Sequence, residues 1–112
     1  MTDRCDIGNR KCQPCEGGVA PLGAAEAREL LAALPGWRID GEQLEKAFAF
    51  ANHYEALAFV NAVAWVSHRE DHHPQLVVGY RDVRVRYWTH AIGGLSENDF
   101  ICAAKLEKLL VL

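Results

Sequence analysis

The chain has 112 residues, of which 50% are hydrophobic and 24% charged, as expected for a single globular domain with a modest core of its own. Its formal net charge of −3 argues against a protein that holds nucleic acid on a basic surface, because phosphate contacts need clustered lysine and arginine. The longest apolar run, over residues 56–66, is too short to span a membrane.

The first 20 residues differ from the rest of the chain. They show little apolar periodicity, contain Gly17-Gly18, and carry three of the four cysteines. We interpret residues 1–20 as an irregular N-terminal extension and residues 21–112 as the folded domain. No apolar stretch typical of a signal peptide follows Met1, so we expect a cytoplasmic protein whose cysteines are reduced thiols.

The first half of the domain predicts a helix followed by a hairpin. Apolar residues recur at helical spacing over residues 24–34, and Pro35-Gly36 stops that helix. Alternating patterns over residues 37–39 and 44–50 predict two strands. Asp40-Gly41 between them favours a hairpin with a somewhat longer loop.

The next segment predicts a long helix. Asn52 followed by Glu55 is typical of a capping box, and the helix should run to about Arg69. It is apolar on nearly all sides, so it must be covered on two sides. The sheet would cover one side, and a second helix or a second subunit the other.

The remaining elements are a second hairpin and a last helix. Pro74 ends the long helix, strands follow over residues 76–80 and 83–88, and Ser96 caps a helix that reaches about Leu110. The order of elements predicts an α+β domain in which a four-stranded antiparallel sheet has three helices packed on one face.

Four of the five histidines lie between His68 and His90. Imidazole gains and loses a proton near neutral pH, so a histidine cluster suits acid-base chemistry. A metal site is the alternative, because His68 and His72 are four residues apart. However, the helix must end by about His73, which weakens the case that His68 and His72 face the same way.

The histidines belong to a longer spaced pattern, which reads His68-x3-His72-His73-Pro74-x5-Tyr80-x9-His90-x8-Asp99. Its surroundings include Trp88-Thr89-His90 and Gly94-Leu95-Ser96-x2-Asp99. Pattern and surroundings together resemble the signature of the pterin-4a-carbinolamine dehydratases, and the resemblance covers the chain from Leu22 to its C-terminus.

The resemblance implies a lyase that removes water from 4a-hydroxytetrahydrobiopterin and releases quinonoid dihydropterin, in tetrahydropterin recycling. It implies no metal and no organic cofactor, and a homodimer or homotetramer. The implied catalytic residues are His72, His73, His90 and Asp99. The implied substrate-binding residues are Asp71, His72, His73, Tyr80, Trp88, Thr89, His90 and Ala91.

Several residues have a structural alternative. Asp99 lies three residues after Ser96 and is equally suited to a capping box. Tyr80 is as well placed to pack under the site as to touch substrate. His68 stands where many relatives have glutamate, whose acceptor chemistry imidazole does not reproduce.

Two other functions stay open from the sequence. One is a non-catalytic pterin-binding or protein-interaction module of the same fold, such as an assembly factor or a dimerisation partner. The other is a zinc protein, because Cys12-Gln13-Pro14-Cys15 has the spacing of a metal knuckle or redox pair. One such pair supplies too few ligands for a structural zinc, and Cys102 is expected in the core.

Overall fold

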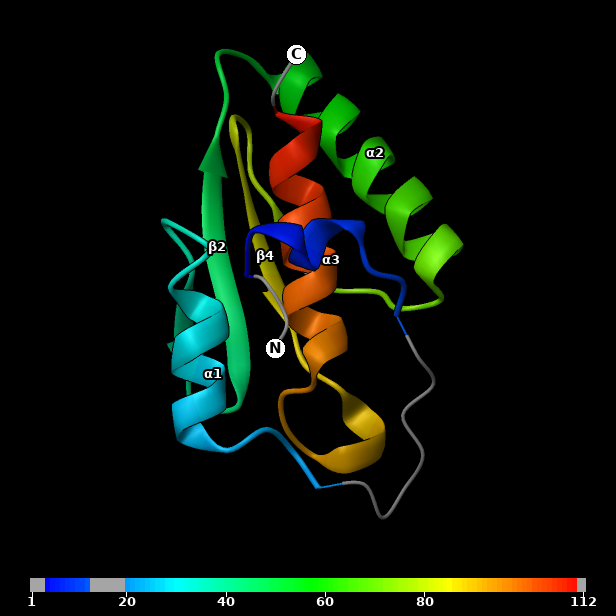
Figure 1. The fold of residues 1–112 in the computed structure, drawn as a ribbon. Coiled ribbons are helices and arrows are strands. Elements are labelled where there is room, and N and C mark those ends of the chain that lie inside the picture. Colours follow the sequence, from blue (N-terminus) through cyan, green and yellow to red (C-terminus); the bar gives the residue numbers. More distant parts are fainter. Residues whose placement is uncertain (1–3, 13–19, 111–112) are drawn as a thin grey trace.

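The computed structural model describes residues 4–12 and 20–110. Three helices cover one face of a four-stranded antiparallel sheet, which confirms the predicted α+β class, and the short helix η1 crosses α3 (Figure 1). The helices are η1 (Arg4–Asn9), α1 (Ala24–Leu31), α2 (His53–Glu70), η2 (His90–Ile92) and α3 (Glu97–Leu109). The strands are β1 (Arg38–Asp40), β2 (Gln43–Ala49), β3 (Gln75–Val78) and β4 (Asp82–Tyr87).

The sheet joins the two hairpins through their inner strands. The strand order is β1-β2-β4-β3, and β2 pairs with β4 from Leu44 opposite Tyr87 to Ala49 opposite Asp82. Val83, Val85 and Tyr87 of β4 are fully buried against the helices. The centre of the core therefore lies between β4 and α3, whose side chains also reach the site described below.

The first hairpin is tighter than predicted. Asp40 pairs directly with Gln43, so only Gly41 and Glu42 form the loop. Two-residue hairpin turns need positive φ, and Gly41 has a φ of 62°. The prediction of a longer loop is wrong because this glycine permits the shorter turn.

The second hairpin departs from the predicted strand boundaries at Tyr80. Strand β3 ends at Val78, and the Gly79 N–H donates to the Asp82 carbonyl at 2.8 Å, which closes the turn. Tyr80 therefore lies in the loop and not in a strand. Its ring stacks on His53 with centroids 5.3 Å apart, and 74% of the residue is exposed.

The helix boundaries follow their caps. Asn52 Oδ1 accepts the Glu55 N–H at 2.9 Å, as the sequence predicts for the start of α2. Helix α1 ends at Leu31, three residues early, because the Ala33 and Leu34 N–H groups turn to carbonyls three residues back. Leu34 is nevertheless buried in the core.

The described part of the N-terminal extension is folded onto α3, where an irregular segment was expected. Residues 4–9 form helix η1, and Ile7 is only 2% exposed. Lys105 Nζ of α3 donates to the Gly8 carbonyl at 3.0 Å. This docking brings Lys11 and Cys12 to the end of α2, more than fifty residues away along the chain.

Candidate active site

The end of α2 directs the histidines into the site. Asp71 caps the helix in the left-handed conformation, with a φ of 52°, and it is the one described residue other than glycine with positive φ. Aspartate tolerates this conformation better than most residues. The chain turns at Asp71, so His72 and His73 leave the helix axis instead of continuing along it.

The turn also places His72 beyond the end of the helix that carries His68. His68 remains on α2, where its ring lies 5.7 Å from that of Trp65. His68 does not line that site but borders a neighbouring shallow hollow, whose lining also includes His72 and His73. The two histidines do not share a helical face, because α2 ends at Glu70.

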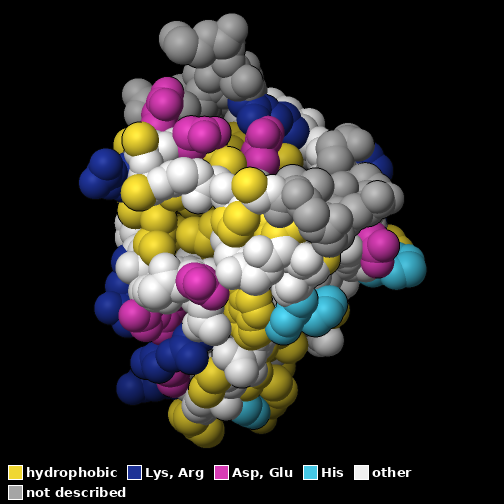
Figure 2. All heavy atoms as spheres, turned by 90° about the horizontal axis from the view of Figure 1, so that it is seen from below, with side chains coloured by type: hydrophobic (Ala, Val, Ile, Leu, Met, Phe, Trp, Pro, Cys, Tyr) yellow, Lys and Arg dark blue, Asp and Glu magenta, His cyan; other side chains and the backbone are white. Residues whose placement is uncertain are grey.

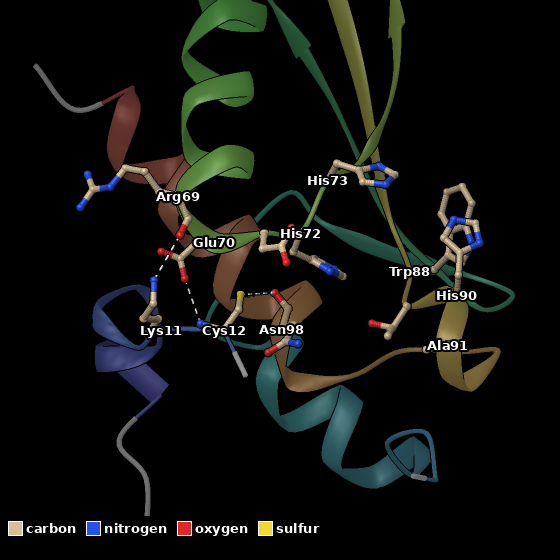
Figure 3. A pocket seen from close by; sticks show the side chains of 12 residues that line it. Lys11, Cys12, Arg69, Glu70, His72, His73, Trp88, His90, Ala91 and Asn98 are labelled. Carbon is tan, nitrogen blue, oxygen red and sulfur yellow. Dashed lines mark hydrogen bonds between the residues drawn. The ribbon is translucent and has the colours of Figure 1, made fainter. Parts of the chain in front are cut away.

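A pocket of about 620 Å³ lies where the end of α2, the segment after β4, the start of α3 and the N-terminal segment meet (Figure 3). Seen from below, histidine side chains gather on this face beside hydrophobic side chains (Figure 2). The residues that line the pocket are Lys11, Cys12, Arg69, Glu70, Asp71, His72, His73, Trp88, Thr89, His90, Ala91 and Asn98.

A buried carboxylate holds His72. His72 Nε2 lies 2.6 Å from Asp99 Oδ1, and Asp99 is completely buried. The other carboxylate oxygen accepts the Thr89 hydroxyl and the Ser96 N–H, each at 2.9 Å. Because a carboxylate can only accept here, Nε2 carries the proton and Nδ1 is the acceptor nitrogen of neutral His72.

The Tyr87 ring packs against the face of the His72 ring. The His72 and Tyr87 rings are parallel within 9°, with centroids 5.7 Å apart. Burial raises the pKa of the Tyr87 phenol well above its ordinary value, so the ring that supports His72 is neutral. Stacking and the Asp99 contact together fix the orientation of the His72 imidazole.

His73 and His90 face each other across the exposed side of the pocket. Their ring centroids are 6.5 Å apart. The Trp88 indole N–H donates to His90 Nδ1 at 3.2 Å. An indole nitrogen only donates, so Nδ1 is the acceptor and Nε2 carries the proton of neutral His90.

The structure brings together most of the residues implied by the sequence resemblance. Seven of them line the pocket, and Asp99 lies behind His72. Asp99 also forms the predicted capping box with Ser96, so its structural and positioning contacts coexist. Tyr80 does not line this pocket but borders a hollow at the β3–β4 turn with Phe50 and Arg81.

Five lining residues were missed by sequence reasoning: Lys11, Cys12, Arg69, Glu70 and Asn98. Lys11 and Cys12 come from the segment interpreted as an extension, and their contacts with α2 leave no periodic signal. Arg69 and Glu70 lie inside the histidine motif, between His68 and His72, and this position in the sequence was the signal that could have identified them. In Figure 3 the Arg69 side chain points away from the histidines.

Within residues 4–12 and 20–110, no three His, Cys, Asp or Glu side chains are grouped so that they could hold a metal ion. Of the predicted knuckle at Cys12 and Cys15, Cys15 lies outside the described residues. Over the same ranges, no helix is long and apolar enough to cross a membrane.

Comparison with known proteins decides the family. Residues 20–109 match the family model described as pterin 4 alpha carbinolamine dehydratase. The chain belongs to this family. The dehydratase activity expected from the sequence is thus confirmed at the level of the family: these enzymes are lyases that act on a pterin carbinolamine.

Named relatives agree with this family assignment. A protein of Dechloromonas aromatica is 69% identical over 110 residues, 98% of each chain, and one of Nitrosomonas eutropha is 60% identical over 112 residues, 99% of each. Both are grouped by name with the pterin-4-alpha-carbinolamine dehydratases.

Solved structures share the dehydratase fold. The transcriptional coactivator/pterin dehydratase of Brucella melitensis superimposes with a TM-score of 0.76 and 33% identity, over 80% of this chain and 97% of that one. A pterin dehydratase-like RuBisCO assembly factor of the alpha-carboxysome gives a TM-score of 0.57 and 30% identity, over 66% and 88%.

Proposed function

We propose that this dehydratase converts 4a-hydroxytetrahydrobiopterin to quinonoid dihydropterin by histidine acid-base catalysis, in tetrahydropterin recycling. The observation that carries the proposal is the convergence of three histidines on one pocket, one of them oriented by a buried carboxylate. Loss of water needs an acid for the hydroxyl on C4a and a base for the proton on N5. The new double bond forms between C4a and N5.

His72 is suited to the role of base. Its Nε2–H is bonded to Asp99, which leaves Nδ1 as the nitrogen that can take the N5 proton. The buried carboxylate stabilises the imidazolium that forms, as in other histidine bases that are oriented by a carboxylate. Asp99 is therefore a positioning residue in this proposal.

His90 is suited to the role of acid. Trp88 occupies its Nδ1, so the Nε2–H is the proton that can be given to the departing hydroxyl. His73 lies opposite His90 and shares the exposed side of the pocket. The segments 71–73 and 88–91 would hold the pterin ring between them, partly by backbone hydrogen bonds.

The non-catalytic alternative has one supporting comparison, the similarity to the RuBisCO assembly factor. That match covers less of this chain than the match to the Brucella protein does. An assembly role by itself has no need of a histidine held by a buried carboxylate. Catalysis accounts for the histidine arrangement, so we favour it.

The decisive experiment measures dehydration of enzymatically generated 4a-hydroxytetrahydropterin from the decay of its ultraviolet absorbance. We expect the wild type to exceed the spontaneous rate. His72→Ala and His90→Ala should each lower kcat by at least ~10-fold, since an acid-base group contributes roughly 10²–10⁴ in rate.

His53→Ala is the matched control, because His53 begins α2, contacts Tyr80 of the β3–β4 turn and does not line the pocket. It should keep the wild-type rate. If folded wild-type protein adds nothing to the spontaneous rate, the catalytic proposal is overturned and a binding role becomes the better account.

We also propose that the protein is a cytoplasmic homodimer or homotetramer. The support for assembly is α2, which leaves Tyr54, Leu57 and Trp65 substantially exposed in a single chain. These side chains recur at helical spacing along one side of α2. A second copy of the chain would cover them.

A further inference from the structure

Two cysteines from distant parts of the chain meet at the wall of the pocket. Cys12 Sγ lies 3.5 Å from Cys102 Sγ. Cys102 is completely buried in α3, whereas Cys12 is half-buried and lines the pocket. One thiol is therefore within reach of a small solute, and the other lies directly behind it.

The surrounding contacts hold the two sulfur atoms together. The Cys12 N–H donates to Glu70 Oε1 at 2.9 Å, and Lys11 Nζ donates to the Arg69 carbonyl at 3.1 Å (Figure 3). The segment is thus fixed against the end of α2 on one side and against α3 on the other. A disulfide bond is about 2.05 Å long, so the two sulfur atoms need approach by only about 1.5 Å.

The two thiols are unequal in their chemistry. The hydrogen bond with Cys12 and then burial raise the pKa of the Cys102 thiol well above its ordinary value, so Cys102 keeps its proton. Cys12 is the accessible partner and the one that an oxidant meets first. Oxidation of Cys12 removes the hydrogen bond that is the main cause of the raised Cys102 pKa.

We propose that Cys12 and Cys102 are a redox-active pair, which forms a disulfide when a small hydroperoxide enters the pocket. The Cys12 thiol gives up its proton and its sulfur attacks the terminal peroxide oxygen. The S–O bond forms, the O–O bond breaks, and the departing alkoxide takes up the proton lost by Cys12 and leaves as an alcohol, or as water from hydrogen peroxide. This step yields a sulfenic acid at Cys12.

The Cys102 sulfur then attacks the Cys12 sulfur. The S–S bond forms, the S–O bond breaks, and the hydroxide that leaves takes the Cys102 proton as water. Overall, two thiols and one hydroperoxide give one disulfide, one alcohol and one water. The two thiols lose two electrons, and the peroxide gains them.

The disulfide would link the N-terminal wall of the pocket to α3 covalently. Cys102 lies one helical turn after Asp99, so the link would be made next to the residue that orients His72. Oxidation would thereby fix residues 11–12 in the position that the hydrogen bonds now hold. The inference concerns the thiols and does not depend on the proposed dehydration.

The test uses the full chain and a double variant, Cys5→Ser with Cys15→Ser, which retains only the proposed pair. Both proteins are reduced, treated with hydrogen peroxide and quenched with catalase. We expect intact mass to fall by two hydrogen atoms, peptide mapping to join residues 12 and 102, and dithiothreitol to restore both thiols.

Cys12→Ser, made in the double variant, is the matched control and should form no intramolecular disulfide. Because Cys12 is accessible, replacing it should disturb folding less than replacing buried Cys102 would. Circular dichroism checks the fold of the variant. The proposal is overturned if the folded double variant keeps both thiols, or if peroxide takes Cys12 to sulfinic acid while Cys102 stays reduced.

Discussion

The Asp99 carboxylate combines two contacts that are usually made by different residues. One oxygen accepts the Ser96 N–H at the start of α3 and the Thr89 hydroxyl, and the other contacts His72. The same side chain therefore fixes the start of a helix and the tautomer of a pocket histidine. A substitution at Asp99 has to separate these two effects.

Asp99→Asn separates them. The amide oxygen can still accept the Ser96 N–H, but the amide N–H₂ then faces His72 Nε2 and favours the tautomer with the proton on Nδ1. We expect kcat to fall by at least ~10-fold with a changed pH-rate profile, because the acceptor nitrogen is lost from the pocket. Steady-state kinetics across pH measure this effect.

Ser96→Ala is the matched control for the helix cap. It removes a side chain at the same helix start but leaves the His72–Asp99 contact in place. The free energy of unfolding should fall by about 1 kcal/mol, while kcat stays close to that of the wild type. An equal loss of kcat in both variants would assign Asp99 to the cap alone.

At the scale of single residues, the sequence predicted which histidines come together in the pocket, but it did not predict all the other residues that line it. The spacing around Pro74 and His90 was sufficient to group His72, His73 and His90, because each lies at the end of a predictable element. Cys12 and Glu70 were missed because they meet through tertiary packing across 58 residues. Tyr80 was misplaced because its strand ends at Val78.

At the level of the elements, the Glu70 carboxylate is one of the groups that attach the N-terminal segment to α2. Glu70 accepts the Cys12 N–H, and Lys105 Nζ lies 3.9 Å from its other oxygen. Burial alone would raise the pKa of Glu70, but the Cys12 hydrogen bond, Lys105 and Lys11 outweigh it and lower the pKa below its ordinary value.

Glu70→Gln should therefore destabilise the protein in a pH-dependent way. Because the pKa of Glu70 is lowered in the folded protein, the ionised carboxylate stabilises the fold fully at a pH above the pKa of an unfolded glutamate, and this contribution is lost as the pH falls through the lower folded pKa. We expect the variant to lose about 0.5–1 kcal/mol of unfolding free energy at pH 7. The difference should vanish in acid.

Urea denaturation at neutral and acidic pH measures the effect. Glu42→Gln is the control, since Glu42 is an exposed glutamate in the first hairpin loop. A pH-independent difference between Glu70→Gln and the wild type would contradict the electrostatic account. Such a result would mean that the side-chain amide simply packs less well than the carboxylate.

The order of helices and strands predicts the overall fold better than the position of any single helix or strand boundary does. Two hairpins, each followed by a helix, were sufficient to predict a four-stranded antiparallel sheet covered on one face. The pairing of β2 with β4 was not predicted, because contacts between hairpins depend on how the helices pack. The docking of η1 on α3 was missed for the same reason.

The large apolar side chains exposed on α2 bear on how whole molecules assemble. Trp65 is 63% exposed on α2, and Tyr54 is 81% exposed eleven residues earlier on the same side. Full burial of one large apolar side chain is worth roughly 1.5–3 kcal/mol. A second copy that covered these residues would gain that burial at several positions in each chain.

Trp65→Glu should therefore shift the protein to a smaller species, because a carboxylate buried in an apolar interface is costly. Trp65→Phe keeps an apolar ring and should keep the wild-type assembly. Size-exclusion chromatography with light scattering, over a range of protein concentrations, measures the mass of each variant.

A wild type that is monomeric at every concentration would refute the assembly. A dimer or tetramer that persists in Trp65→Glu would mean that the interface does not involve this side of α2. His68 lies beside Trp65 and borders the hollow next to His72, so an assembly through α2 would bring the partner subunit close to the mouth of the pocket.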